Sequence, residues 1–319
     1  MAISLKDIKA KLAADKEKLE NRFVADNAVY PFWKMQESQT ALVRFLPDSN
    51  ESNTFFWQEK LEIKLPFKGI AHEHDNDVTV TVPCMEMYGE KCLVLTEVRP
   101  WWNIPSLKDQ ASTYWKKRKY ILQGFVVSTP FEEKDVPANP IRRFILGPMV
   151  FDIIKSTLVT DLEENPTAFI GGCDFRITRG PNKGKFPNYG SSNWSRKTRD
   201  LSADETEALE TYPLQALQTF LPAKPSAEAI VAIKEMFEAS VNGEAYDPSR
   251  WDKFYKPSSF NNTEGDNDKV VSKAKAIDTS SSDEVGEVVT KSTKVAEETN
   301  APSNNASEII KRLKARHTS

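Results

Sequence analysis

The pattern of hydrophobic and polar positions predicts a series of short strands along the first two thirds of the chain. Residues 54–65 and 173–178 alternate, residues 78–82 are a β-branched run, and residues 120–127 and 142–146 are typical of buried strands. The strand-like runs are residues 41–46, 54–65, 78–82, 120–127, 142–146 and 173–178. They are rich in β-branched and aromatic residues, which pack well on a pleated surface. Pro47-Asp48 and Pro83 end two of the runs, and the composition of residues 179–184 is typical of a hairpin turn.

Helical spacing is confined to a few segments. Apolar residues recur every three or four positions in residues 4–20, 150–158 and 227–241, and Ser202 begins an acidic helix that extends to Leu209. Many short strands with few helices predict a mixed β protein of the α+β class, with a small β-barrel core and helical decorations.

The composition changes near the C-terminus. Residues 261–305 contain no aromatic residue and are dominated by Ser, Thr, Asn, Asp, Glu and Lys. Such a segment buries too little apolar surface to offset its chain entropy. We therefore predict a disordered acidic and polar linker over 256–306 and a short basic amphipathic helix over 307–319, which docks on a partner protein. A basic N-terminal helix over 1–25 and a core over 26–255 complete the domain plan.

Several classes of protein are excluded by simple patterns. No stretch approaches about eighteen uninterrupted apolar residues, so we expect no membrane span. Residues 1–22 interleave lysines with acidic residues and lack the apolar core of a secretory signal peptide. The three cysteines, Cys84, Cys92 and Cys173, are too few for a disulfide framework. This cysteine usage indicates a reducing compartment, and we expect a cytoplasmic protein.

The overall charge of −3 conceals an uneven distribution. Residues 111–200 carry 15 lysines and arginines against 9 acidic residues, whereas residues 201–260 carry 5 against 10. A basic block between acidic flanks can attract a polyanion while the whole protein stays soluble. The alternative is a solvated face whose cations bind nothing.

The strongest local signal lies in residues 114–120, where three aromatic residues bracket four consecutive cations. In order they are Tyr114, Trp115, Lys116, Lys117, Arg118, Lys119 and Tyr120. Cations neutralise phosphates, and aromatic faces stack on unpaired bases. Because side chains alternate along a strand, some of these cations share a face with Tyr120. The alternative is a basic strand entry whose rings belong to the core.

Two further clusters repeat the pairing of cations with rings. Arg142 and Arg143 precede Phe144, and Lys185 precedes Phe186 and Tyr189. Three such clusters within one basic block favour nucleic-acid binding. Interleaved rings favour single strands, because the bases of a duplex are already stacked and hidden.

Catalysis and metal binding have little support. The chain has only three histidines and contains no nucleophile elbow and no HExxH motif, so we expect a protein that is not an enzyme. His72, His74, Cys84 and Cys92 are the residue types that bind zinc, but no CxxC is present. We therefore expect no cofactor, with zinc at these four residues as the weaker alternative.

The order of these clusters resembles the helix-destabilising single-stranded DNA-binding proteins of T-even bacteriophages and their marine relatives. It begins with residues 41–47, continues through the basic strand and residues 142–154, and ends with residues 186–189. The resemblance covers roughly residues 30–200.

This resemblance implies an OB-fold core with a basic cleft beside an adjoining subdomain. It places Tyr120, Phe144, Phe186 and Tyr189 at the ring positions of the cleft, and residues 116–119 on its basic strand. It also implies that the N-terminal segment binds a neighbouring copy, which makes DNA coating cooperative, and that the C-terminal region contacts replication and recombination proteins. The chain departs from the family in its zinc ligands, since Cys92 stands alone, and in its basic terminal helix.

From the residues and the resemblance together, we expect a phage protein that coats single-stranded DNA during replication, recombination and repair in the cytoplasm of a bacterial host. Two alternatives remain from the residues alone. One is an RNA-binding regulator on the same scaffold, because stacking does not identify the sugar. The other is a phage assembly protein whose basic block meets an acidic partner.

Overall fold

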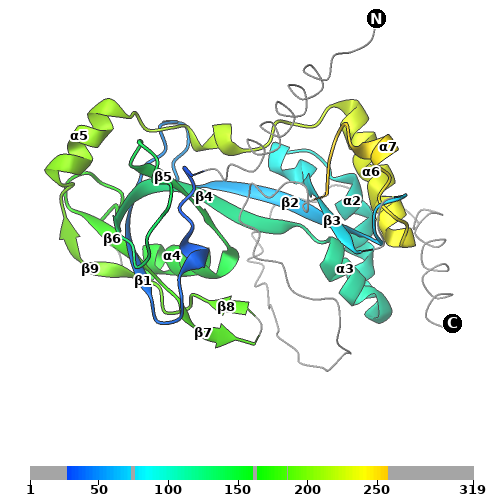
Figure 1. Cartoon of the computed structure of the whole chain (residues 1–319), viewed down its shortest axis with the longest axis horizontal. Coiled ribbons are helices and arrows are strands. Elements are labelled where there is room, and N and C mark those ends of the chain that lie inside the picture. Colours follow the sequence, from blue (N-terminus) through cyan, green and yellow to red (C-terminus); the bar gives the residue numbers. More distant parts are fainter. Residues whose placement is uncertain (1–26, 73–75, 161–163, 185, 258–319) are drawn as a thin grey trace, which may run out of the picture. The chain divides into compact units, whose positions relative to one another are not determined.

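An antiparallel sheet organises the chain (Figure 1). The structure, a computed structural model, describes residues 27–72, 76–160, 164–184 and 186–257. Seven strands pair in the order β3-β2-β4-β1-β6-β9, and β5 also pairs with β4. The strands are β1 (Thr40–Leu46), β2 (Gln58–Phe67), β3 (Val78–Pro83), β4 (Lys117–Ser128), β5 (Ile141–Leu146), β6 (Gly172–Thr178) and β9 (Asn193–Arg199). A separate hairpin is formed by β7 (Gly180–Lys183) and β8 (Phe186–Asn188).

Strand β4 is the centre of this arrangement because different parts of it pair with three other strands. Residues 117–121 pair with β2, and residues 123–128 pair with β1. β5 pairs with residues 120–125. Gly124 is required where β1 passes, since an added Cβ would lie 2.2 Å from the carbonyl oxygen of Arg44.

The six predicted strands are confirmed, although β2 spans Gln58–Phe67 where residues 54–65 were expected, and the short strand β8 was not expected. Two further corrections concern β7 and β9. Residues 180–183, expected within a turn, form strand β7, and the chain reverses at Gly184 instead. Strand β9 was not expected, because its sequence is almost entirely polar. The pairings among the described residues do not close the sheet into a barrel, so the structure establishes a mixed α+β protein with a largely antiparallel sheet.

One end of the sheet forms a compact unit that we call the sheet region: β1, β5, β6, β9, the C-terminal half of β4, and the helices α4 (Pro148–Thr160) and α5 (Ala203–Thr211). Its inner face packs on α4 through Val150, Phe151 and Ile154. Alternate residues of the strands fill the core between the sheet and α4. These residues include Phe45, Leu122, Phe144, Phe175 and Trp194. This burial explains the period-two pattern in the sequence.

The outer face of the sheet region carries a buried ion network. Arg44 is fully buried, and its Nη1 lies 3.6 Å from Asp174 Oδ1. Arg199 bridges Asp174 and Glu205, at 2.8 and 2.7 Å. Glu205 also completes a capping box with Ser202 at the start of α5, so the network fixes this helix beside the sheet.

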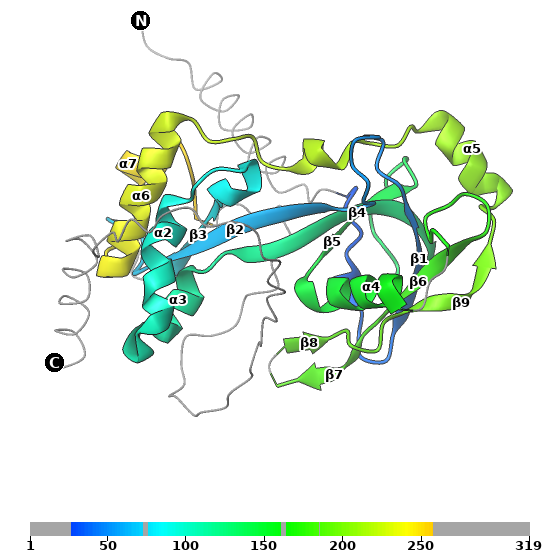
Figure 2. The ribbon, with the colours of Figure 1, turned by 180° about the vertical axis from the view of Figure 1, so that it is seen from behind.

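The other end of the sheet is covered by short helices and forms what we call the helical region (Figure 2). It contains the outer half of β2, β3 and the helices η2 (Met85–Tyr88), α2 (Leu93–Val98), η3 (Arg99–Asn103), η4 (Pro105–Leu107), α3 (Lys108–Tyr114), α6 (Ala227–Asn242) and α7 (Pro248–Trp251). Of these, the spacing of the sequence predicted only α6. Ser226 caps its first turn and Gly243 ends it in the left-handed conformation.

Several sequence predictions lie outside the described residues: the helix over 4–20, the terminal helix over 307–319 and all but two residues of the linker over 256–306. Within the described part of the chain, no helix has the length and apolar character needed to cross a membrane.

Candidate nucleic-acid interface

The basic run lies at the start of β4, where alternation divides its side chains between two faces. Lys119 is opposite Lys60 of β2, and Leu61 is opposite Arg118. Directly opposite residues of an antiparallel pair project to the same side. Arg118 therefore shares a face with Tyr120, as the sequence predicted, whereas Lys119 projects to the other face.

Carboxylates already neutralise part of the basic run. Lys116 Nζ lies 2.6 Å from Glu86 Oε2, and Lys119 Nζ lies 2.7 Å from Glu62 Oε1. Burial raises the pKa of Glu86, but hydrogen bonds from Lys116 and Arg99 outweigh it and leave that pKa below its ordinary value. These two lysines are therefore committed to ion pairs within the protein, which corrects the expectation of four cations along a cleft.

Arg118 is the most available cation of the run on the Tyr120 face. Its side chain is 50% exposed and its Nη1 lies 3.4 Å from Glu59 Oε1, an exposed pair of the kind that contributes little stability. Lys117 is exposed on the opposite face, where its Nζ donates to the carbonyl of Ser112. Arg118 can therefore turn toward a phosphate at small cost.

Several rings expected to contact bases belong to hydrophobic cores, which corrects their assignment. Phe144 is fully buried in the sheet region. Tyr114 is 6% exposed in the helical region and packs edge-on against Trp101. Tyr189 is 9% exposed and packs edge-on against Phe32. Tyr120, also expected to contact bases, is 7% exposed and stacks on Phe151. These ring faces are occupied by protein, so they are not available for stacking.

The two arginines of β5, Arg142 and Arg143, also contact groups within the protein. Both Nη atoms of Arg142 donate to the carboxylate of Glu133, at 3.1 and 2.7 Å, and the residue is 4% exposed. The guanidinium of Arg143 lies 4.3 Å from the ring centre of Phe220. Neither side chain is positioned as an open phosphate contact.

Phe186 and Trp115 remain at the surface. Phe186 is 66% exposed in the β7–β8 hairpin, next to Lys185, which lies outside the described residues. Trp115 is half-buried and packs edge-on against Trp102, which is 38% exposed. These two expected rings are therefore accessible, but they lie on different elements.

The structure reveals a row of contacting rings, of which the sequence analysis named only Tyr120. We call it the ring row: Phe55, Trp57, Phe151 and Tyr120. Phe55 stacks on Trp57 with ring centres 4.6 Å apart, and Trp57 meets Phe151 edge-on at 5.1 Å. Phe151 in turn stacks on Tyr120 at 3.4 Å and 10°. The triplet of rings at residues 55–57 was its only other sequence signal.

The ring row leads from the core to the surface. Tyr120 and Phe151 are 7% and 4% exposed, Trp57 is half-buried, and Phe55 is 55% exposed. Burial raises the pKa of Tyr120 and the hydrogen bond from Arg118 partly lowers it, so the phenol stays neutral near neutral pH. The exposed ring of Phe55 is thus backed by half-buried Trp57, and the buried end of the row, Tyr120, is bound by Arg118. Exposed rings backed in this way can stack on unpaired bases.

Polar side chains fix the segment that carries Phe55 and Trp57. Asn53 Nδ2 donates to the Trp57 carbonyl at 3.1 Å and to Asp48 Oδ2 at 2.8 Å. Its Oδ1 accepts from the Phe55 N–H at 3.0 Å. Asp48 Oδ1 also accepts from the N–H of Leu217, at the start of η5 (Leu217–Phe220). Asn53 therefore orients both rings from a single side chain.

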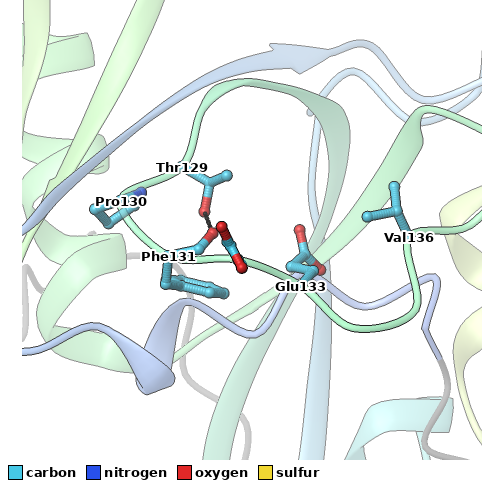
Figure 3. A pocket seen from close by; sticks show the side chains of 6 residues that line it. Thr129, Pro130, Phe131, Glu133 and Val136 are labelled. Atoms are coloured by element: carbon cyan, nitrogen blue, oxygen red, sulfur yellow. Dashed lines mark hydrogen bonds between the residues drawn. The ribbon is translucent and has the colours of Figure 1, made fainter.

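An open hollow of about 570 Å³ lies in the loop between β4 and β5 (Figure 3). Residues 129–133 and Val136 line it. The Thr129 hydroxyl accepts from Tyr30 at 2.9 Å and donates to the Phe131 carbonyl at 3.2 Å. Since the Glu133 carboxylate is bound by Arg142, these polar groups hold the loop in place, and we assign the hollow no chemistry.

Among the described residues, the candidates for zinc are not assembled into a metal site, and the zinc alternative stays a prediction. Within residues 27–72, 76–160, 164–184 and 186–257, no three His, Cys, Asp or Glu side chains lie together in a way that would hold an ion. Cys84 and Cys92 are adjacent through a thiol–thiol hydrogen bond, but two ligands fall short of the tetrahedral set. His74 lies outside the described residues.

A scan of protein-family models gives no match to this chain, and a search of curated proteins gives none.

Proposed function

We propose that this chain binds single-stranded DNA, with the outer rings of the ring row, Phe55 and Trp57, stacking on bases and Arg118 contacting the phosphate backbone. The observation that carries the proposal is the continuous contact from buried Tyr120 to exposed Phe55. A ring supported by a core is already ordered, so stacking a base on it costs little side-chain entropy. The net positive charge of residues 111–200 supports the same partner.

The wider proposal follows the order of the sequence clusters. We propose a variant OB-fold core that coats and protects single-stranded DNA in phage replication, recombination and repair, in the cytoplasm of a bacterial host. Neighbouring copies on the DNA and replication or recombination proteins are the proposed protein partners. The proposed activity is binding, without catalysis and without a cofactor.

The first test is quenching of intrinsic fluorescence by oligo-dT at two salt concentrations, with duplex DNA and a matched RNA as competitors. We expect quenching that weakens steeply with salt and that duplex does not reverse. Preferential reversal by RNA would support an RNA-binding regulator instead. No response to any oligonucleotide would favour the assembly protein, and cleavage of labelled DNA with Mg²⁺ or Mn²⁺ would reveal a nuclease.

A matched pair of variants tests the ring row itself. Phe55→Ala removes an exposed ring of the row, and Phe169→Ala removes an exposed ring, 44% accessible, outside it. Loss of one stacked base costs about 1–3 kcal/mol, or roughly 5- to 150-fold in Kd. We expect this loss for Phe55→Ala alone, by anisotropy of labelled oligo-dT. Equal behaviour of the two variants would refute the ring row as the site.

The role of Arg118 is tested through salt dependence. Arg118→Ala should reduce the slope of log K against log salt by about 1, because one phosphate contact is lost. Phe55→Ala should leave this slope unchanged. Arg118→Lys retains the charge and serves as the control. If Arg118→Ala leaves the salt slope unchanged, Arg118 does not contact the phosphate backbone.

A further inference from the structure

Two of the three cysteines lie side by side in the helical region. Cys84 directly follows β3, and Cys92 is the residue before α2. Their exposed fractions are 0% and 2%, both thiols are free, and they share a hydrogen bond. The third cysteine, Cys173 in β6, is also free and buried.

The fold of the intervening segment explains why the thiols meet. Residues 85–88 form the single turn η2, and Gly89 ends it in the left-handed conformation with φ 73°. The Glu90 N–H then donates to the Met85 carbonyl at 3.2 Å, which returns the chain toward Cys84. The Cys84 N–H is held by the Leu61 carbonyl of β2 at 2.9 Å. Both ends of the segment are therefore fixed by backbone contacts.

The two thiols differ in acidity in a way that suits reaction between them. The hydrogen bond from Cys84, helped by backbone N–H groups of Leu95 and Met85 and opposed by burial, lowers the pKa of Cys92 to about 6. The same contact, together with burial, raises the pKa of Cys84. Cys92 is therefore the more acidic thiol of the pair, and Cys84 is positioned to supply a proton. Burial raises the pKa of Cys173, and no thiol lies among the groups that act on it.

We propose that Cys84 and Cys92 form an intramolecular disulfide when the protein meets a peroxide. The Cys92 thiolate attacks one oxygen of hydrogen peroxide, which breaks the O–O bond, gives a sulfenic acid and releases hydroxide. The Cys84 sulfur then attacks the sulfenic sulfur and displaces its oxygen, which leaves as water with the Cys84 proton. The two sulfurs are each oxidised by one electron, and the peroxide is reduced by two.

Reaction with a peroxide requires local opening, because both thiols are buried. Helices η2 and α2 contain 4 and 6 residues, and such short elements open at lower free energy than the core strands. A thiol pair with this reactivity and without a disulfide framework is typical of reversible oxidation rather than of a permanent structural crosslink.

Peptide mapping of the full-length protein tests the proposal. The native protein is treated with hydrogen peroxide, its remaining thiols are blocked with N-ethylmaleimide, and it is digested with trypsin without reduction. Lys91 lies between the two cysteines, so trypsin separates them unless a disulfide joins the peptides. We expect the joined peptides to accumulate at least tenfold faster than oxidation of Cys173, and dithiothreitol to release them.

Cys173 provides a control that is matched for burial. Cys173→Ala should leave the joined peptides unchanged, whereas Cys92→Ala should abolish them and leave Cys84 as a thiol. Oxidation of all three cysteines at one rate would overturn the proposal, as would conversion of Cys92 to sulfinic acid without crosslinking. The mapping of the unaltered protein decides the question even where a variant fails to fold.

Discussion

The sheet region and the helical region are both built around aromatic clusters, but only one of these clusters reaches the surface. In the helical region Trp101, Tyr114 and Phe237 contact one another and are 0%, 6% and 1% exposed. In the sheet region the cluster continues through Trp57 to the exposed ring of Phe55. Aromatic content alone therefore does not identify a binding surface; an unbroken contact between core and solvent does.

The two regions also differ in how they use charge. On the outer face of the sheet region, Arg44, Asp174, Arg199 and Glu205 form a largely buried network. In the helical region, the Glu86–Lys116 pair is partly buried, whereas the Arg250–Glu235 pair, at 3.2 Å, has half-exposed side chains. Desolvated ion pairs are costly to break on one side, whereas exposed pairs contribute little. We therefore expect the network of Arg44, Asp174, Arg199 and Glu205 to respond more strongly to pH than the Arg250–Glu235 pair.

The largest expected effect separates core rings from surface rings. Phe144→Ala removes a fully buried ring of the sheet region and should lower the free energy of unfolding by about 3–5 kcal/mol. Phe55→Ala should lower it by less than about 0.5 kcal/mol, because its ring is mostly exposed. Urea unfolding followed by circular dichroism measures both values.

For DNA affinity we expect the larger loss in Phe55→Ala and the smaller loss in Phe144→Ala. Below the unfolding transition, Phe144→Ala should bind oligo-dT nearly as tightly as the unaltered protein, and Phe55→Ala should not. If both variants lost stability and affinity together, the distinction between an enclosed and an open cluster would fail.

The difference between the sheet region and the helical region also explains which elements could be predicted from the sequence. Strand β6 was predicted from its alternating sequence, and β4 from a continuous apolar run that is buried over residues 120–125. Helices α2 and α3 contain 6 and 7 residues and follow or precede proline-containing turns. Helices this short are held by packing rather than by their own propensity, so their sequences carry little periodic signal.

The candidate site was predicted only in part, for a related reason. The run at residues 114–120 identified Arg118 and one face of β4, because alternation is a local property. Whether Tyr114 or Phe144 is buried depends on residues distant in sequence, such as Phe237 of α6 and Phe45 of β1. The contact between Trp57 and Phe151 joins residues almost a hundred positions apart, and no local pattern encodes it.

A second prediction tests the charge contrast through pH. Burial raises the pKa of Glu205, but hydrogen bonds from Arg199 and the Ser202 N–H outweigh it, so the folded-state pKa lies below its ordinary value. The stability from Glu205 is therefore complete above its unfolded pKa, about 4.3, and is lost as the pH falls through the lower, folded value. Glu205→Gln should cost about 1–3 kcal/mol at neutral pH and flatten this acid loss.

Glu235→Gln supplies the control from the helical region. It removes one partner of an exposed ion pair, so the free energy of unfolding should change by less than about 1 kcal/mol at any pH. Urea titrations between about pH 6 and pH 3 compare the two variants. If the free energy of unfolding of both variants changed equally with pH, the buried network would not respond to pH more strongly than the exposed pair.

The smallest expected effect concerns how the ring row is held open to solvent. Asn53→Ala removes the amide that binds the Phe55 N–H and the Trp57 carbonyl, while water can replace these bonds at the surface. Affinity for oligo-dT should fall by about fivefold, near 1 kcal/mol, as the two rings lose their shared orientation. The salt slope should stay constant because no cation changes, and the urea midpoint should move little. A changed slope with unchanged affinity would mean that Asn53 acts on the charge around Arg118 instead, and that the rings hold their orientation through the contact with Phe151 alone.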